Sequence, residues 1–232
     1  VIAARAGHSV RLWSRNEAVV SSINEQRVNS RYLSATSIPD DVTATGDIES
    51  ALQDASLVLL AVPSHAARET LIAMTSQLPE DAIIVNVAKG IEIESGKRIS
   101  EIVKEVVTGT HPFVTLSGPS FAKEVVAGHP TAIVAASKDS AAARTVQNDL
   151  SFENLRIYTN ADVVGTEVGG SVKNVMAIAA GMAAGLGFGT NSVAALITRG
   201  LAEITRLARR EGGQIETLMG LAGLGDLVLT CT

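Results

Sequence analysis

The stretch 82-AIIVNVAKG-90 is a short aliphatic run that ends in a lysine and a glycine. A run that is apolar at almost every position is typical of a strand buried on both faces of a sheet. Two similar runs, 57-LVLLAV-62 and 113-FVTLSG-118, precede and follow it, and helical patterns fill the intervals. This alternation predicts a largely parallel sheet with helices on both faces.

The same alternation continues through the first two-thirds of the chain. Further predicted strands are 9-SVRLW-13, 131-TAIVAAS-137 and 155-LRIYT-159, and the predicted helices include 16–28, 65–78 and 99–107. Beyond Asn160 the strand signals stop and one helical pattern follows another. The sequence therefore predicts an α/β domain over residues 1–159 and the start of an all-helical domain over residues 160–232.

Three consecutive predicted strands end in similar chemistry: Pro63-Ser64, Lys89-Gly90 and Pro119-Ser120. The carboxyl ends of parallel strands share one edge, and ligands bind just outside it. Gly118-Pro119-Ser120 also has the pattern of a helix start, with free amides for an anion. A lysine among three such turns favours a ligand site, although Pro, Gly and Ser also occur in plain connections.

Composition excludes several classes of protein. The chain has 232 residues, a net charge of −5 and one cysteine, Cys231. The negative net charge gives no electrostatic reason to expect nucleic-acid binding. A single cysteine cannot form a disulfide within the chain, which fits a cytoplasmic location. No Cys/His spacing predicts a metal site. The uncharged stretch 174–198 resembles a membrane helix, but its glycines favour two buried helices joined at 187-GFGTNS-192.

Lys173 lies in the predicted helix 168-VGGSVKNVMAIAAGM-182, among glycines and aliphatic residues. A buried ammonium is costly unless it is paired or loses its proton. Small neighbours such as Gly169 and Gly170 leave room beside it for a ligand, and burial would lower its pKa. The alternatives are a lysine that extends to the surface and a structural ion pair.

Arg15 follows the predicted strand 9–13. In dinucleotide-binding folds an acidic residue at this place holds the ribose hydroxyls, whereas an arginine accommodates a 2′-phosphate. Arg15 therefore favours NADPH over NADH, with a plain surface arginine as the alternative.

Several motifs occur together in one order: VPSH, AKG, GPSFAKEV, GGSVKNV, GFGTN, ALITRG and AGLGDLVLTC. As a set they closely resemble the NAD(P)-dependent glycerol-3-phosphate dehydrogenases of the bacterial type. The resemblance implies a Rossmann domain that binds NADP or NAD, followed by a helical substrate domain. It also implies reduction of dihydroxyacetone phosphate to sn-glycerol 3-phosphate for glycerophospholipid synthesis.

The resemblance implies roles for single residues, with Lys173 as the catalytic proton donor and acceptor. The implied cofactor contacts are Arg15, Tyr32, Pro63, Lys89 and Ala122, and the implied substrate contacts are Lys89, Gly118, Ser120, Lys173, Asn174, Asp226 and Thr230. The family's glycine loop would precede Val1 and its serine-arginine-asparagine phosphate clamp would follow Thr232. We therefore expect a chain trimmed at both ends, and whether it is active stays open.

Two rival functions stay open at this point. A related lysine-dependent dehydrogenase of small hydroxy or keto acids would share the sheet and the lysine helix. A non-catalytic nucleotide-binding protein would keep the fold without turnover. A homodimer is also left open, and no membrane insertion is expected.

Overall fold

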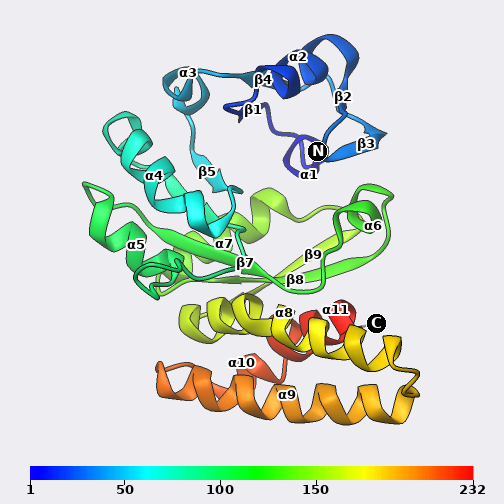
Figure 1. The fold of residues 1–232 in the computed structure, drawn as a ribbon. Coiled ribbons are helices and arrows are strands. Elements are labelled where there is room, and N and C mark those ends of the chain that lie inside the picture. The colour runs from blue at the N-terminus through cyan, green and yellow to red at the C-terminus, as the bar shows by residue number, and fades with distance from the viewer. Residues whose placement is uncertain (232) are drawn as a thin grey trace.

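The computed structural model describes residues 1–231 and is built around a five-stranded sheet (Figure 1). Its strands, in spatial order, are β5 (Leu57–Leu60), β6 (Ile83–Asn86), β7 (Phe113–Ser117), β8 (Thr131–Ala136) and β9 (Leu155–Asn160). All neighbouring strands are parallel except β7 and β8, which pair antiparallel. The predicted mostly parallel sheet is confirmed, with one antiparallel pair that the local pattern did not indicate.

Two smaller sheets precede it along the chain. β1 (Val10–Trp13) pairs in parallel with β4 (Val42–Thr45), and β2 (Val28–Asn29) pairs antiparallel with β3 (Leu33–Ser37). Within residues 1–231, β1 pairs with β4 and with no strand of the main sheet, a pairing that the sequence analysis did not address. Strand pairing depends on distant partners, which hydrophobic periodicity does not specify.

Helices cover both faces of the main sheet. α4 (Ser64–Met74) and α5 (Ile99–Val106) pack on one face, where Leu71 and Ile102 meet Ile84 of β6. α7 (Ser140–Leu150) packs on the other face, against Val85. Consecutive residues of β6 are thus buried on opposite faces, which explains its unbroken aliphatic run. The remaining short elements of this part are α1 (Ile2–Arg5), α2 (Glu17–Gln26), α3 (Ile48–Leu52), η1 (Thr75–Gln77) and α6 (Ala122–Val126).

The turn after β7 differs from its prediction. The helix expected at Pro119 begins only at Ala122, after Phe121 at the N-cap position, so residues 118–120 form an irregular loop. Gly118 has a φ of 137°, a conformation that side-chain-bearing residues rarely adopt. A helix cannot start through such a residue, and the short α6 follows instead.

A layer of helices follows β9. α8 (Val163–Gly185) lies between the main sheet and α9 (Thr190–Arg210), as Figure 1 shows. α10 (Ile215–Leu218), the π-helical turn η2 (Leu221–Gly225) and α11 (Asp226–Cys231) pack back against α8. Asp162 caps α8 by accepting from the Gly165 amide at 2.8 Å. The last strand ends at Asn160, where the sequence predicts the change to helices.

The second half of α8 is less buried than predicted. Val175, Ile178 and Met182 are each more than half exposed, although α8 and α9 are joined near Gly187 as expected. Close helix packing does not explain Gly185, Gly187 and Gly189, because no atom would lie within 4 Å of an added Cβ. Among the described residues, no helix combines the length and apolarity needed to cross a membrane.

Candidate active site

The turn after β6 is held in shape by Asn86, the buried last residue of that strand. Its Oδ1 accepts from the Ala88 amide at 3.0 Å, and its Nδ2 donates to Thr115 Oγ1 of β7 at 3.1 Å. An amide side chain can donate and accept at once, so a single residue fixes the turn to the next strand. Lys89 follows directly and is aimed along the edge toward the end of β7.

The tips of β5 and β6 approach each other closely. A Cβ added to Gly90 would lie 2.3 Å from Ser64 Oγ, so only glycine fits between this turn and the start of α4. Pro63, at the N-cap position of α4, is exposed beside it. The two turns are therefore in tight contact at the carboxyl edge of the sheet, with the Ser64 side chain against the backbone of Gly90.

Gly118 links the tip of β7 to the tip of β6. Its carbonyl accepts from Lys89 Nζ at 2.9 Å and from Ser120 Oγ at 3.1 Å. A Cβ at Gly118 would lie 3.1 Å from the Cα of Ile133. The structure thus brings Lys89, Gly118 and Ser120 together, as predicted from the shared edge.

The centre of the site is the lysine–aspartate cluster, formed by Lys89, Lys173 and Asp226. Lys89 Nζ donates to Asp226 Oδ2 at 2.6 Å, and Lys173 Nζ donates to Asp226 Oδ1 at 2.5 Å. Asp226 is 1% exposed and Lys173 is 7% exposed. The alternative of a surface-reaching Lys173 is therefore wrong. The other alternative, a lysine in an ion pair, agrees with the contact between Lys173 and Asp226.

The charges of this cluster do not balance. Two ammonium groups share one carboxylate, so the fully ionised cluster is cationic. Burial lowers the pKa of Lys89, and nearby Lys173 lowers it further, whereas Asp226 acts in the opposite direction. The cluster can therefore attract an anion and hold exchangeable protons.

Close backbone packing places Asp226 at the start of α11. An added Cβ at Gly169 of α8 would lie 2.6 Å from the Ala222 carbonyl oxygen, and one at Gly223 would lie 2.1 Å from that of Leu218. Gly169 thus lets η2 approach α8, and Gly223 lets η2 approach the end of α10; η2 leads directly into Asp226. Thr230 Oγ1 donates to the Asp226 backbone carbonyl at 2.6 Å, so its hydroxyl supports α11.

Asn174 and Ala122 lie outside this cluster. Asn174 is exposed, about 100° around α8 from its buried neighbour Lys173. No hydrogen bond joins Asn174 to the cluster within the described part of the chain. Ala122 begins α6 and, with Ser120, lines a neighbouring cavity.

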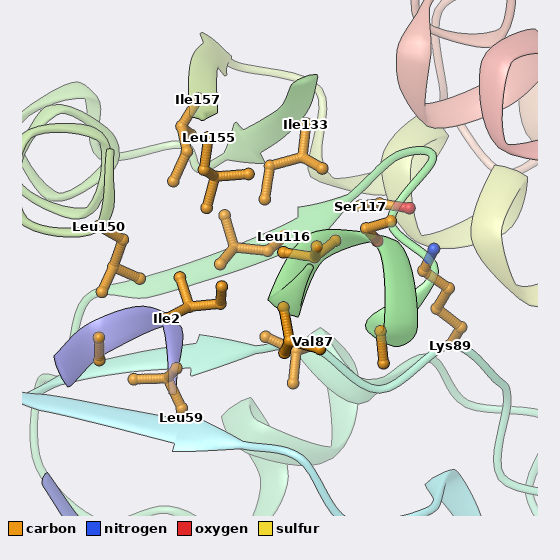
Figure 2. A pocket seen from close by; sticks show the side chains of 15 residues that line it. Ile2, Leu59, Val87, Lys89, Leu116, Ser117, Ile133, Leu150, Leu155 and Ile157 are labelled. Carbon is orange, nitrogen blue, oxygen red and sulfur yellow. The ribbon is translucent and has the colours of Figure 1, made fainter. Parts of the chain in front are cut away.

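That cavity, of about 270 Å³, lies beside the sheet (Figure 2). Its walls are mostly aliphatic, with Leu116 from β7 and Val87 from the turn just after β6. In Figure 2, Lys89 and Ser117 lie together at one end, away from Leu150. The hydroxyl of Ser117 is buried and has no hydrogen-bond partner. The polar end of the cavity therefore adjoins the lysine–aspartate cluster.

The two outer residues expected at the cofactor are both accessible. Arg15 follows β1, its side chain is 65% exposed, and its Nη1 lies 3.4 Å from Glu69 Oε2 of α4. Tyr32, in the turn between β2 and β3, is 71% exposed, with the Arg31 guanidinium 5.4 Å from its ring centroid. Neither residue contacts the lysine–aspartate cluster.

Sequence reasoning missed Glu167, a buried carboxylate six residues before Lys173 on α8. It accepts from the Ser100 amide at 2.8 Å and from Ser100 Oγ at 2.5 Å. A signal was available, because Glu167 and Lys173 are the only ionisable side chains in α8. Its distant partner on α5 was not readable from the sequence.

Two family models match nearly the whole chain. The NAD-dependent glycerol-3-phosphate dehydrogenase N-terminus matches residues 1–143, and the corresponding C-terminus matches residues 162–232. This chain is 53% identical to glycerol-3-phosphate dehydrogenase (NAD(P)+) of Koribacter versatilis over 234 residues, which cover all of this chain and 69% of that protein. It is 47% identical to the Clostridium tetani enzyme of the same name, covering 66% of it.

A solved structure agrees with these matches. The crystal structure of glycerol-3-phosphate dehydrogenase from Coxiella burnetii superposes on all of this chain with a TM-score of 0.95. The sequence identity is 42%, and 70% of that chain is covered. The predicted resemblance is thus confirmed, and the chain belongs to the NAD(P)-dependent glycerol-3-phosphate dehydrogenase family.

Proposed function

We propose that this protein reduces dihydroxyacetone phosphate to sn-glycerol 3-phosphate, reversibly, and so supplies glycerophospholipid synthesis. The observation that carries this proposal is the meeting of Lys89 and Lys173 on Asp226, at the carboxyl edge of β5, β6 and β7. The family membership supports the choice of substrate. The cofactor is NADP or NAD, with NADPH favoured.

The proposed chemistry needs a proton donor beside the substrate carbonyl. When bound, the reduced nicotinamide supplies a hydride to the carbonyl carbon, and the carbonyl bond's electron pair moves to oxygen. The Lys173 ammonium gives its proton to that oxygen and is left as a neutral amine. In the oxidative direction the amine takes the hydroxyl proton. Asp226 keeps the ammonium oriented through its 2.5 Å contact.

Excess positive charge in the lysine–aspartate cluster suits an anionic triose phosphate. We assign Lys89, Gly118 and Ser120 to the substrate because they lie on one edge and are linked by hydrogen bonds. Asn174 would reach it only from the exposed side of α8, and Thr230 would act one turn beyond Asp226.

The cofactor would lie across the same edge. The fit is supported by the close approach of Gly90 to the Ser64 side chain, which keeps the turns after β5 and β6 compact at this edge. Arg15 would hold a 2′-phosphate, since its guanidinium is exposed and, among residues 1–231, has only the exposed Glu69 as a partner. Tyr32, Pro63, Lys89 and Ala122 complete the proposed contacts.

The test is turnover of the purified full-length protein with dihydroxyacetone phosphate, followed by NADPH absorbance. Lys173→Ala should lower kcat by about 10²- to 10⁴-fold, because the proton donor is lost. NADPH affinity, measured by fluorescence titration, should stay nearly unchanged. The control is Lys138→Ala, which removes an exposed lysine between β8 and α7.

Three outcomes would contradict the proposal. Full activity of Lys173→Ala would remove this lysine from catalysis. Preferred turnover of small keto acids would favour the related dehydrogenase. NADPH binding without turnover of either substrate class would favour a non-catalytic nucleotide-binding protein.

Location and assembly are also proposals. The single cysteine, partly buried Cys231, supports the cytoplasm, because it forms no disulfide within the chain. Fractionation of the lysed cells would test that location. The homodimer stays a prediction, and sedimentation of the purified protein would measure the assembly.

A further inference from the structure

Glu167 joins the two halves of the molecule at a helix end. At the start of α5, Arg98 occupies the N-cap position and its side chain cannot accept a hydrogen bond. Glu101 accepts from the Arg98 amide at 3.0 Å, which leaves the Ser100 amide to another acceptor. The Glu167 carboxylate of α8 takes that place and accepts from the Ser100 amide, in the first turn of α5. A residue of the helical layer thus caps a helix of the sheet domain.

This contact is buried and charged. The side chain of Glu167 is 3% exposed, and Arg98 Nη1 lies 3.5 Å from its Oε2. Burial raises the pKa of Glu167, while the Ser100 hydrogen bonds act in the opposite direction. Glu167→Gln removes the charge that faces Arg98 and turns one acceptor oxygen into a donor, so the Ser100 amide and hydroxyl can no longer each donate to an oxygen of their own, which is costly in a buried place.

The contact between Glu167 and Ser100 joins the two segments that carry the lysines, α8 and the loop before α5. The loop 87–98, which carries Lys89, leads directly into α5. On α8, Gly170 follows Glu167 by three residues, and an added Cβ there would lie 3.0 Å from Ser117 Oγ and 3.6 Å from Lys89 Cγ. Lys173 follows after three more residues and contacts Asp226. Three residues of α8, spaced three apart, therefore make successive contacts. Glu167 contacts α5, Gly170 lies against the Lys89 side chain, and Lys173 contacts Asp226.

We propose that Glu167 is a positioning residue, which holds α8 against the Lys89 loop so that both ammonium groups converge on Asp226. The proposal deepens the proposed function and rests on it for its effect on turnover. The position of the two lysines can be measured without turnover, so this part of the proposal can be tested independently of the proposed function.

The first test measures the accessibility of the lysines without using activity. Glu167→Gln and the milder Ser100→Ala would be treated with an amine-acylating reagent, and mass spectrometry would follow the labelling of Lys89 and Lys173. Both variants should label faster than the wild type, more so for Glu167→Gln. The matched control is Glu101→Gln, because Glu101 also pairs with Arg98, at 2.9 Å, and accepts from the Arg98 amide at the same helix start. It is 41% exposed and, in the described chain, makes no hydrogen bond to α8.

The second test measures turnover well below the unfolding temperature. Glu167→Gln should lower kcat by about tenfold or more, since small misplacements of reacting groups are costly. The KM for NADPH should change by less than about twofold, because uniform binding is retained. Glu101→Gln should keep both values.

The outcomes separate the two proposals. Unchanged labelling and unchanged kcat in Glu167→Gln would overturn the inference, as would equal effects of Glu101→Gln. A lower unfolding temperature with wild-type labelling and kcat would reduce Glu167 to a structural role and also overturn it. Faster labelling in a protein whose wild type has no turnover would uphold the positioning of the lysines and refute the proposed function.

Discussion

Two ionic clusters include residues of the loop 87–98, and they differ in burial and in charge balance. The arginine–glutamate cluster, formed by Arg68, Glu92, Lys97 and Glu105, has two cations and two carboxylates and is partly exposed. The lysine–aspartate cluster has two cations for one carboxylate and lies inside. A balanced cluster stabilises the loop without a ligand. An unbalanced, buried cluster is costly on its own and becomes useful when an anion binds.

The pKa shifts follow the same division. Two hydrogen bonds from Arg68 lower the pKa of Glu92 to about 2, a shift that favours the ionised form. Burial lowers the pKa of Lys89, a shift that disfavours the ionised form. The pKa shift of Glu92 thus favours a permanent charge in the outer cluster, whereas the pKa shift of Lys89 favours the neutral amine in the inner cluster.

The largest effect is expected for Asp226→Asn. This change leaves the buried Lys173 and the partly buried Lys89 without their shared carboxylate, and it should lower the free energy of unfolding by roughly 3–5 kcal/mol. Turnover should fall as well, because Lys173 loses its orientation. Urea denaturation and NADPH absorbance would measure both. Glu105→Gln, the matched change in the outer cluster, should be far milder, and equal effects would refute the contrast.

Gly118→Ala should have the next largest effect. The backbone φ of 137° and the 3.1 Å approach to Ile133 both oppose a methyl group, so a loss of about 1–3 kcal/mol in stability is expected. The Gly118 carbonyl would also move away from Lys89. Gly96→Ala is the control, since Gly96 has a φ of 68° and open space around it. Equal denaturation midpoints would show that the close approach is unimportant.

Arg15→Asp extends the comparison to a fully exposed ion pair. Its partner Glu69 is 76% exposed, so protein stability should hardly change. NADPH affinity should fall by about tenfold relative to NADH, because a charge-assisted contact to the 2′-phosphate is lost. Arg11→Asp, an exposed change on β1 shortly before Arg15, controls for net charge in the titrations. An unchanged cofactor ratio would contradict the 2′-phosphate assignment.

Glu92→Gln should weaken the outer cluster in a pH-dependent way. Since the folded pKa is about 2 and the unfolded value is 4.5, the ionised carboxylate stabilises the fold above about pH 4.5. That contribution is lost as the pH falls through this window. The gap in urea midpoint between wild type and variant should therefore narrow in acid. Glu94→Gln, an exposed change in the same loop, should show no such gap.

The sequence was sufficient for the strands that carry the site. β5, β6 and β7 are predictable because strands buried on both faces give aliphatic runs, and parallel strands place Pro63, Lys89 and Pro119 on one edge. The antiparallel pairing of β8 and the isolation of β1 from the main sheet were not, since pairing depends on distant partners.

The site itself was only partly predictable from residue patterns. A lone lysine in a helix indicated a partner or a function, but its contact with Asp226 became visible only through resemblance and then through the fold. Gly118 was read as part of a helix start, because φ is not encoded in a Gly-Pro-Ser pattern. Glu167 was missed for the opposite reason: its acceptor role exists only because Ser100 begins a distant helix.

Lys89→Met sharpens the comparison with the smallest expected effect. The folded pKa of Lys89 lies below its ordinary value of 10.5, so between the two values the unfolded chain binds more protons than the folded one. Wild-type stability should therefore rise relative to Lys89→Met as the pH increases through this alkaline window, whereas Glu92 acts only in acid. Urea midpoints of both proteins would measure the trend, with the exposed Lys104→Met on α5 as the control. If wild-type stability instead falls relative to Lys89→Met over this pH range, the contact with Asp226, rather than burial, determines the pKa of Lys89.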